Sequence, residues 1–190
     1  LIKEGGNIMK NICKKILVVI CAALLFTGCS CSINDNKPEE AIETFFEKYR
    51  AKDDNIIEQL KETIENEDLT DNQKEEYQEL MEKQYDQFAY VIKDVKENEN
   101  NATATVEVTV LNYRSAIDEA EKELEENPEA FNDDEGNFSE EKYMDYRIEK
   151  MQEVTDTTTH TIELSLTKEN GMWDVDQLSS DDISKLHGLY

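Results

Sequence analysis

The chain has 190 residues and is strongly acidic: 45 Asp and Glu against 20 Lys and Arg, a formal net charge of −25. Proteins bind nucleic acids largely through Lys and Arg contacts to phosphates, so this balance argues against a nucleic-acid partner. The four Cys stand at positions 13, 21, 29 and 31, so residues 32–190 have neither a disulfide framework nor a Cys metal site.

The first thirty residues have the pattern of an export signal. Lys14 and Lys15 precede the apolar run Ile16–Phe26, which is shorter than the roughly 20 residues that a membrane span needs and so favours a cleaved leader. Phe26-Thr27-Gly28-Cys29 resembles the lipobox of bacterial lipoproteins, with Phe26 where Leu is usual. The resemblance implies cleavage between Gly28 and Cys29 and a diacylglycerol on the Cys29 thiol. Two acyl chains anchor a protein stably.

These features divide the chain into three parts. We expect residues 1–28 to comprise an extension upstream of Met9 and the signal peptide. Residues 29–37 would be the lipidated Cys and a polar tether, and residues 38–190 one folded domain. The expected location is the extracytoplasmic face of the cell membrane, in a Gram-positive host.

Three amphipathic helices are expected first. Pro38 suits the first helical position and Glu39 and Glu40 suit the positive helix end. Asp53 or Asp54 would cap a second helix, and the pair Thr70 and Gln73 predicts a capping box on a third. Their apolar positions are Ile42, Phe45, Phe46, Tyr49, Ile56, Ile57, Leu60, Ile64, Tyr77, Leu80, Met81 and Tyr85.

Strands should follow, with helices between them. Strand signals cover 88–96, 102–113, 155–168 and 172–176, with a turn at 98–101 and a hairpin at Asn170-Gly171. Ala104, Val106, Val108 and Val110 alternate with polar residues, which is typical of an antiparallel strand with one buried face. Helices are predicted over 115–126, from Ser139 with Tyr143, Met144, Ile148 and Met151 inward, and over 181–186. This order predicts an α+β fold.

The Pro38–Ile42 start, Phe45-Phe46 and the closing Gly171–Val175 segment resemble small bacterial lipoproteins with a nuclear-transport-factor-2-like (cystatin-like) domain. That family's fold packs N-terminal helices into a bent antiparallel sheet, which together form a cone. The stretch 115–154 would be a helical insertion between middle strands. The resemblance implies a cone interior that is either filled or a pocket, for which the candidate residues are Phe45, Tyr49, Tyr90, His160 and Trp173.

Signs of catalysis or metal binding are weak. Residues 132–139 resemble part of a calcium loop, but Phe131 and Lys142 stand where its end ligands belong, and we read a turn capped by Ser139. Asp94 and Tyr90 could combine with His160 as a general base only if the fold brought them together. We therefore predict no catalytic residue, no metal and no cofactor.

The sequence favours a membrane-anchored, non-enzymatic binding or accessory module. Its partners would be membrane lipid through acylated Cys29 and either a small apolar ligand or a protein. Three alternatives stay open: an isomerase- or dehydratase-type enzyme using a cone pocket, a homodimeric structural module, and a substrate-specific partner of a neighbouring secreted toxin or transporter.

Overall fold

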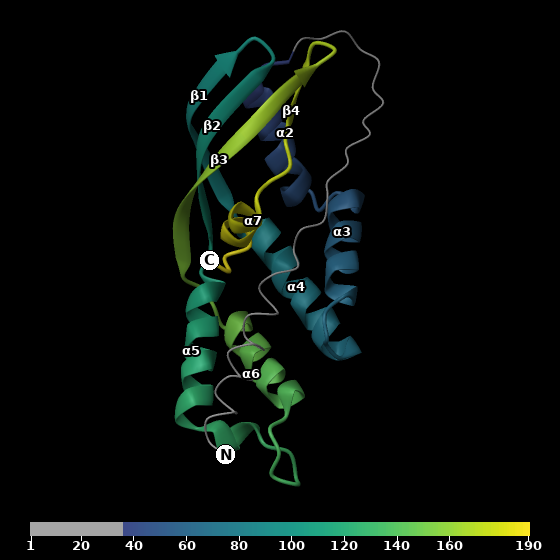
Figure 1. Ribbon diagram of the computed structural model, residues 1–190, viewed down its shortest axis with the longest axis vertical. Helices are drawn as coiled ribbons and strands as arrows, with labels where there is room; N and C mark the ends of the chain where they lie inside the picture. The colour runs from purple at the N-terminus through teal and green to yellow at the C-terminus, as the bar shows by residue number, and fades with distance from the viewer. Residues whose placement is uncertain (1–35) are drawn as a thin grey trace.

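The computed structural model describes residues 36–190, so Gly28, Cys29 and the leader lie outside the described residues. Within that range the fold is α+β, with six α-helices, one 3-10 turn and one four-stranded antiparallel sheet in the order β1-β2-β3-β4. The elements are α2 (Pro38–Arg50), α3 (Asp54–Glu65), α4 (Asp71–Gln87), β1 (Ala89–Asn98), β2 (Asn101–Leu111), α5 (Tyr113–Glu126), η1 (Pro128–Phe131), α6 (Glu140–Gln152), β3 (Thr157–Glu169), β4 (Met172–Val175) and α7 (Ser180–Leu186). Figure 1 shows their arrangement.

The predicted helix starts are confirmed by their caps. Pro38 is the first residue of α2, and the Asp53 carboxylate accepts a hydrogen bond at the start of α3. At α4 the capping box is complete: the Thr70 hydroxyl accepts from the Gln73 N–H, while the Gln73 side chain accepts from the Thr70 N–H. Such reciprocal bonds satisfy N–H groups that a helix start leaves without partners.

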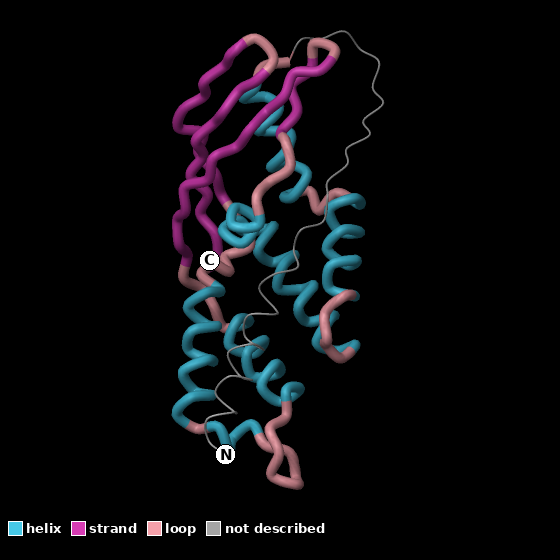
Figure 2. Tube along the Cα trace, viewed as in Figure 1, coloured by secondary structure: helices cyan, strands magenta, loops and turns pink. Residues whose placement is uncertain are grey.

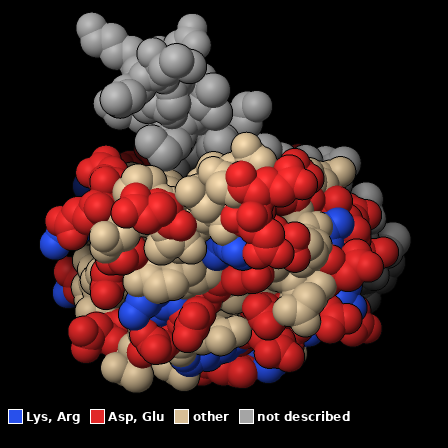
Figure 3. Space-filling model, turned by 90° about the horizontal axis from the view of Figure 1, so that it is seen from below, with Lys and Arg blue, Asp and Glu red and all other residues tan. Residues whose placement is uncertain are grey.

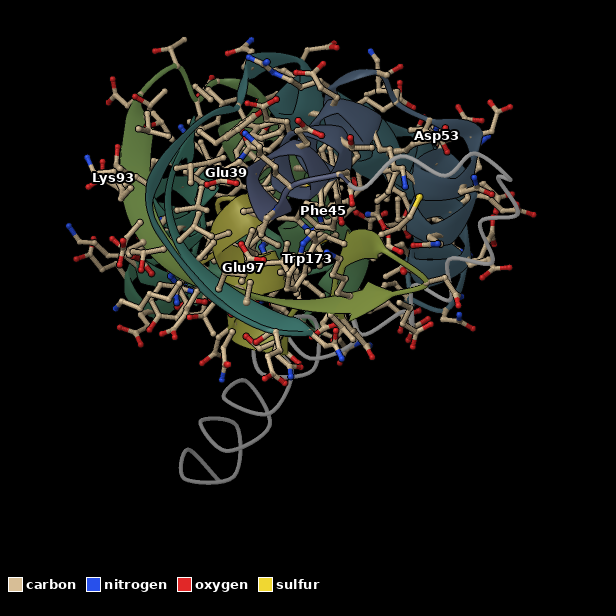
Figure 4. The ribbon with its side chains drawn as sticks, turned by 90° about the horizontal axis from the view of Figure 1, so that it is seen from above. Glu39, Phe45, Asp53, Lys93, Glu97 and Trp173 are labelled. Atoms are coloured by element: carbon tan, nitrogen blue, oxygen red, sulfur yellow. The ribbon has the colours of Figure 1, made fainter. Side chains whose placement is uncertain are left out.

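The sheet curves around α2, and its concave face carries the core. Ala104, Val106, Val108 and Val110 of β2 are all buried, as their alternation predicted. Seen from above in Figure 4, the strands wrap α2, with the labelled Phe45 and Trp173 inside the curve. The convex face exposes mainly Thr, Ser and Glu side chains.

The second strand ends two residues earlier than predicted, because a helix cap follows it directly. Asn112 accepts a hydrogen bond from the Ser115 N–H and starts α5 at Tyr113, whereas the sequence pattern predicted the strand through Tyr113. The Tyr113 hydroxyl donates to the Leu80 carbonyl at 2.9 Å, which buries the ring against α4. A local cap therefore overrides the β-propensity of this tyrosine.

The chain between β2 and β3 forms an antiparallel helix pair, α5 and α6, that extends beyond the sheet (Figure 2). It has a small core of its own, made of Ala120, Leu124, Phe131 and Tyr143. Ser139 caps α6, as predicted. On the other side α6 packs against α4, and this contact creates the cavity described below.

The C-terminal region closes the open end of the sheet. Asn170 and Gly171 both have positive φ, 53° and 87°, as a tight hairpin turn requires. After β4, α7 packs against β2 and β3. At the sheet edge the Asn36 side chain pairs with the backbone of Trp173, accepting its N–H at 2.6 Å and donating to its carbonyl at 3.1 Å. The first described residue is thus bound to the edge strand.

Candidate functional site: a cavity with a buried arginine

Three of the five predicted pocket residues fill the core. Phe45, Tyr49 and Trp173 are all buried. Phe45 packs against Tyr49 with ring centroids 5.3 Å apart, and Tyr49 packs edge-on against Tyr85 at the same separation. Burial raises the pKa of Tyr49. These rings contribute apolar packing rather than a lining of free space.

Tyr90 and His160 share the concave face. In the register of the sheet Val108 pairs with both, Tyr90 on one side and His160 on the other. Tyr90 stacks on Phe46 with centroids 4.4 Å apart, and His160 packs edge-on against Tyr190 at 5.8 Å. The buried Nε2 of His160 has no hydrogen-bond partner among the described residues, and burial lowers the pKa of this histidine.

Asp94 does not join them. A β-bulge at Lys93 shifts the register between Ile92 and Asp94, so Asp94 pairs with Thr105 on the convex face. Its carboxylate is exposed and contacts Lys96 at 3.3 Å. A regular strand would place Tyr90, Ile92 and Asp94 on one face of the sheet. Lys93, the extra residue of the bulge, moves Asp94 to the opposite face. The hypothetical grouping of Asp94 with Tyr90 and His160 is wrong.

The acidic loop before α6 is closed by its own hydrogen bonds. The Asp133 carboxylate accepts backbone N–H bonds from Glu135 and Asn137, each at 2.9 Å, and these bonds lower its pKa. Asn132 and Phe138 form an isolated antiparallel bridge across the loop. Across residues 36–190, no cluster of three or more His, Cys, Asp or Glu side chains is arranged to hold a metal ion.

The most distinctive feature lies elsewhere, in a cavity between α3, α4 and α6. It encloses about 20 Å³, which is roughly the room that one water molecule needs. None of the five predicted residues lines it. Its walls are mostly apolar, made of Leu60, Ile64, Leu69, Met144, Ile148 and Met151, together with Thr63, Glu67, Tyr77 and Arg147.

Arg147 is the unusual member of this wall. Only 4% of its surface is exposed, and it makes no ion pair or hydrogen bond with any described residue. Charged side chains are seldom buried unless they are paired. Helical periodicity could have identified this position, because Arg147 lies three residues after Met144 and four residues before Met151, on the same stripe. The predicted inward face of this helix included Met144, Ile148 and Met151 but not the arginine.

Two polar groups stand near the guanidinium. Burial raises the pKa of the Glu67 carboxyl while the charge of Arg147 lowers it in part. Burial likewise raises the pKa of Tyr77, and Arg147 again acts in the opposite direction. The guanidinium thus acts electrostatically on both groups without contacting either as an ion pair.

The wall formed by α4 and α6 is bound at both ends. The Gln73 amide donates to the Glu141 carbonyl at 3.0 Å and to the Asp145 carboxylate at 2.6 Å. The Lys83 ammonium donates to the Gln152 and Val154 carbonyls, at 3.1 and 3.3 Å. These polar contacts fix the two helices beside each other along the length of the cavity.

The α3 wall is held by apolar packing, with Ile56, Leu60 and Ile64 buried in the core, and by weaker polar contacts. It packs on α4 at the side of the molecule away from the sheet (Figures 1 and 4). Its flanking polar contacts are surface ion pairs: Lys52 with Asp86 and Lys74 with Glu65, each at 2.9 Å. Exposed pairs of this kind typically contribute about 0–1 kcal/mol. The turn before α3 also places Lys52 at a φ of 49°, in the left-handed region that non-glycine residues seldom adopt.

The outer surface is dominated by acidic residues. In the view from below, Figure 3 shows Asp and Glu covering most of the face, with Lys and Arg scattered among them. An open hollow along α2 and the turn after it is lined by four carboxylates and one ammonium group, those of Glu40, Glu43, Glu47, Asp53 and Lys48. This field repels anions at long range, so the buried guanidinium is an isolated positive centre in an acidic protein.

Comparison of the chain with protein-family models, curated proteins and solved structures gave no match to any of them. Within residues 36–190, no helix is both long enough and apolar enough to cross a bilayer. The geometry of the site is that of a small, partly open and mainly apolar cavity with one buried cation in its wall.

Proposed function

We propose that this protein is a lipid-anchored extracytoplasmic lipoprotein whose folded part is a non-enzymatic binding module with a nuclear-transport-factor-2-like domain. The observation that carries the binding role is Arg147, buried without a partner against a cavity between helices. A cation in such a place costs folding free energy, which a bound anion would recover. Retaining it is reasonable in a protein that uses it to bind.

The fold assignment is supported by the order of the elements and by the curvature of the sheet. Within residues 36–190, three helices precede a four-stranded antiparallel sheet, and α2 lies on its concave face. In this proposal the sheet and α2 form the cone, and the α5–α6 pair is the helical insertion between β2 and β3. Phe45 and Trp173 then fill the cone, and the binding cavity lies outside it.

The membrane anchor is supported by the lipobox-like sequence and by the polar tether. Asn36 binds the edge strand at Trp173, so residues 29–35 would connect the acylated Cys29 to this edge of the domain. The acidic surface would be repelled by anionic lipids, and the acyl chains would then have to supply the attachment.

The anchor is tested by expressing the full chain in a Gram-positive bacterium fed an alkyne-tagged palmitate. We expect label on the wild type and on Cys31→Ser, and none on Cys29→Ser. The two variants exchange the same atoms two residues apart, so they distinguish the lipobox cysteine from its neighbour. Label that persists on Cys29→Ser, or an unlabelled wild type, would contradict the lipoprotein assignment.

A further inference from the structure

We infer that the cavity between α3, α4 and α6 is a closed binding site for an amphiphilic monocarboxylate, held by the Arg147 guanidinium and admitted by displacement of α3. This inference rests on the proposed binding function and names its ligand class. The charged end would pair with Arg147 beside Tyr77, and the hydrocarbon would lie against the apolar walls.

The chemistry of the ligand follows from the lining. A guanidinium presents several donors in a planar fork and binds carboxylates with two parallel hydrogen bonds. The other lining residues are mainly Leu, Ile and Met, and Met side chains adapt readily to different apolar shapes. One negative charge suits one buried cation, whereas a second would remain unpaired inside a strongly acidic protein.

The cavity is too small for the ligand as the structure stands, so binding requires it to open. About 20 Å³ holds one water and no hydrocarbon chain, so one wall has to move. Gln73 and Lys83 bind α4 to α6, whereas surface ion pairs flank α3. Moving α3 outward leaves the polar contacts between α4 and α6 intact, and it uncovers the buried side chains of Leu60 and Ile64 together with the guanidinium.

Glu67 competes with the ligand for the same cation. Its carboxyl lines the cavity at the end of α3 and experiences the charge of Arg147. In the closed state it compensates part of that charge from a distance. A ligand carboxylate that contacts Arg147 directly would take over this role, and removing the Glu67 charge should therefore strengthen binding.

The test measures binding of octanoate, with 1-octanol as a neutral ligand of the same chain length, to the full chain carrying Cys29→Ser. Isothermal titration gives the affinities, and circular dichroism verifies the fold of each variant. We expect octanoate to bind at least about 10-fold tighter than octanol, because a hydrogen-bonded charge is worth roughly 1.5–3 kcal/mol.

Three variants make the prediction specific. Arg147→Met keeps the length and apolar character of the side chain and should make octanoate and octanol equivalent. Glu67→Gln should strengthen octanoate binding several-fold and leave octanol unchanged. Arg114→Met removes an equal charge from the surface of α5, where Arg114 pairs with Asp118, and should change neither affinity.

Equal affinities of octanoate and octanol for the parent chain, or octanoate binding that survives Arg147→Met, would overturn the inference. Binding of neither ligand would overturn it as well. Each of these results is separable from the proposed function, because the palmitate labelling of Cys29 tests the anchor independently and a protein partner would still satisfy a binding role.

Discussion

The buried amide of Gln84 is predicted to be one of the most important side chains for stability. Gln84 is completely buried in α4. Its oxygen accepts the Leu111 N–H at 2.8 Å and its nitrogen donates to the Leu111 carbonyl at 3.2 Å. These two bonds satisfy both backbone groups of Leu111, the last residue of β2, where the chain leaves the sheet for α5.

Replacing Gln84 with Met removes both bonds while keeping a side chain of similar length. Each backbone group left buried without a partner costs about 1–3 kcal/mol, so the sum is about 2–6 kcal/mol. We expect a loss of about 3 kcal/mol in the free energy of unfolding. That is a large share of the roughly 5–15 kcal/mol that stabilises a typical domain.

The assay is urea denaturation followed by far-UV circular dichroism. Gln78→Met is the matched control, because Gln78 lies on the same helix and its half-buried amide donates to the Glu82 carboxylate and not to the backbone of a strand. We expect a change within about 0.5 kcal/mol. A loss below about 1 kcal/mol in Gln84→Met, or equal losses in both variants, would refute the reasoning.

Gln84→Glu adds a test by pH. The carboxylate can accept the Leu111 N–H but faces the Leu111 carbonyl oxygen, so the variant should be destabilised at neutral pH. Burial should raise its pKa above the unfolded value. A protonated carboxyl can donate to the carbonyl, so the deficit relative to wild type should shrink as pH falls. A deficit independent of pH would indicate that the two Leu111 contacts do not decide stability.

Three further predictions concern single contacts. Gly188→Ala should lower the free energy of unfolding by about 3 kcal/mol or more, because Gly188 has a φ of +71° and a Cβ there would clash with the Leu111 carbonyl oxygen. A Tm equal to that of the wild type would show that the backbone shifts to accommodate the Cβ. Burial lowers the pKa of His187 from 6.5 to about 4. As the pH falls, the unfolded chain therefore binds a proton at this histidine before the folded protein does, and the free energy of unfolding decreases between about pH 6.5 and pH 4. The decrease between pH 7 and pH 5 should be about 2 kcal/mol. His187→Gln should remove that part of the loss in urea titrations at the two pH values, and an unchanged slope would exclude the histidine as its source. Asn36→Ala should cost about 1–2 kcal/mol and shift the Trp173 fluorescence, since both contacts of Asn36 are to the Trp173 backbone; an unaltered emission spectrum would argue against this contact in solution.

Much of the secondary structure followed from local patterns. The capping box at Thr70, the Asp53 cap, the Asn170-Gly171 turn and the alternation of β2 each depend on residues within a few positions of one another. Those interactions form wherever the segment lies in the fold, so they can be read without knowing its neighbours. The errors were at element ends, as at Tyr113, where the Asn112 cap competed with strand propensity, and in two short irregular features, the 3-10 turn Pro128–Phe131 and the bulge in β1.

The candidate site depended on contacts between distant segments. Periodicity alone placed Arg147 on the buried stripe of α6, but only the packing of α3 and α4 against that stripe shows that the guanidinium lines a cavity near the Glu67 carboxyl without an ion pair between them. Asp94 lies on the convex face because of a bulge in β1, which no period-2 pattern contains. The sequence by itself therefore determined which segments become helices and strands, because that depends on local spacing. The tertiary structure alone decided which side chains meet, because that depends on long-range register and on which helices share a wall.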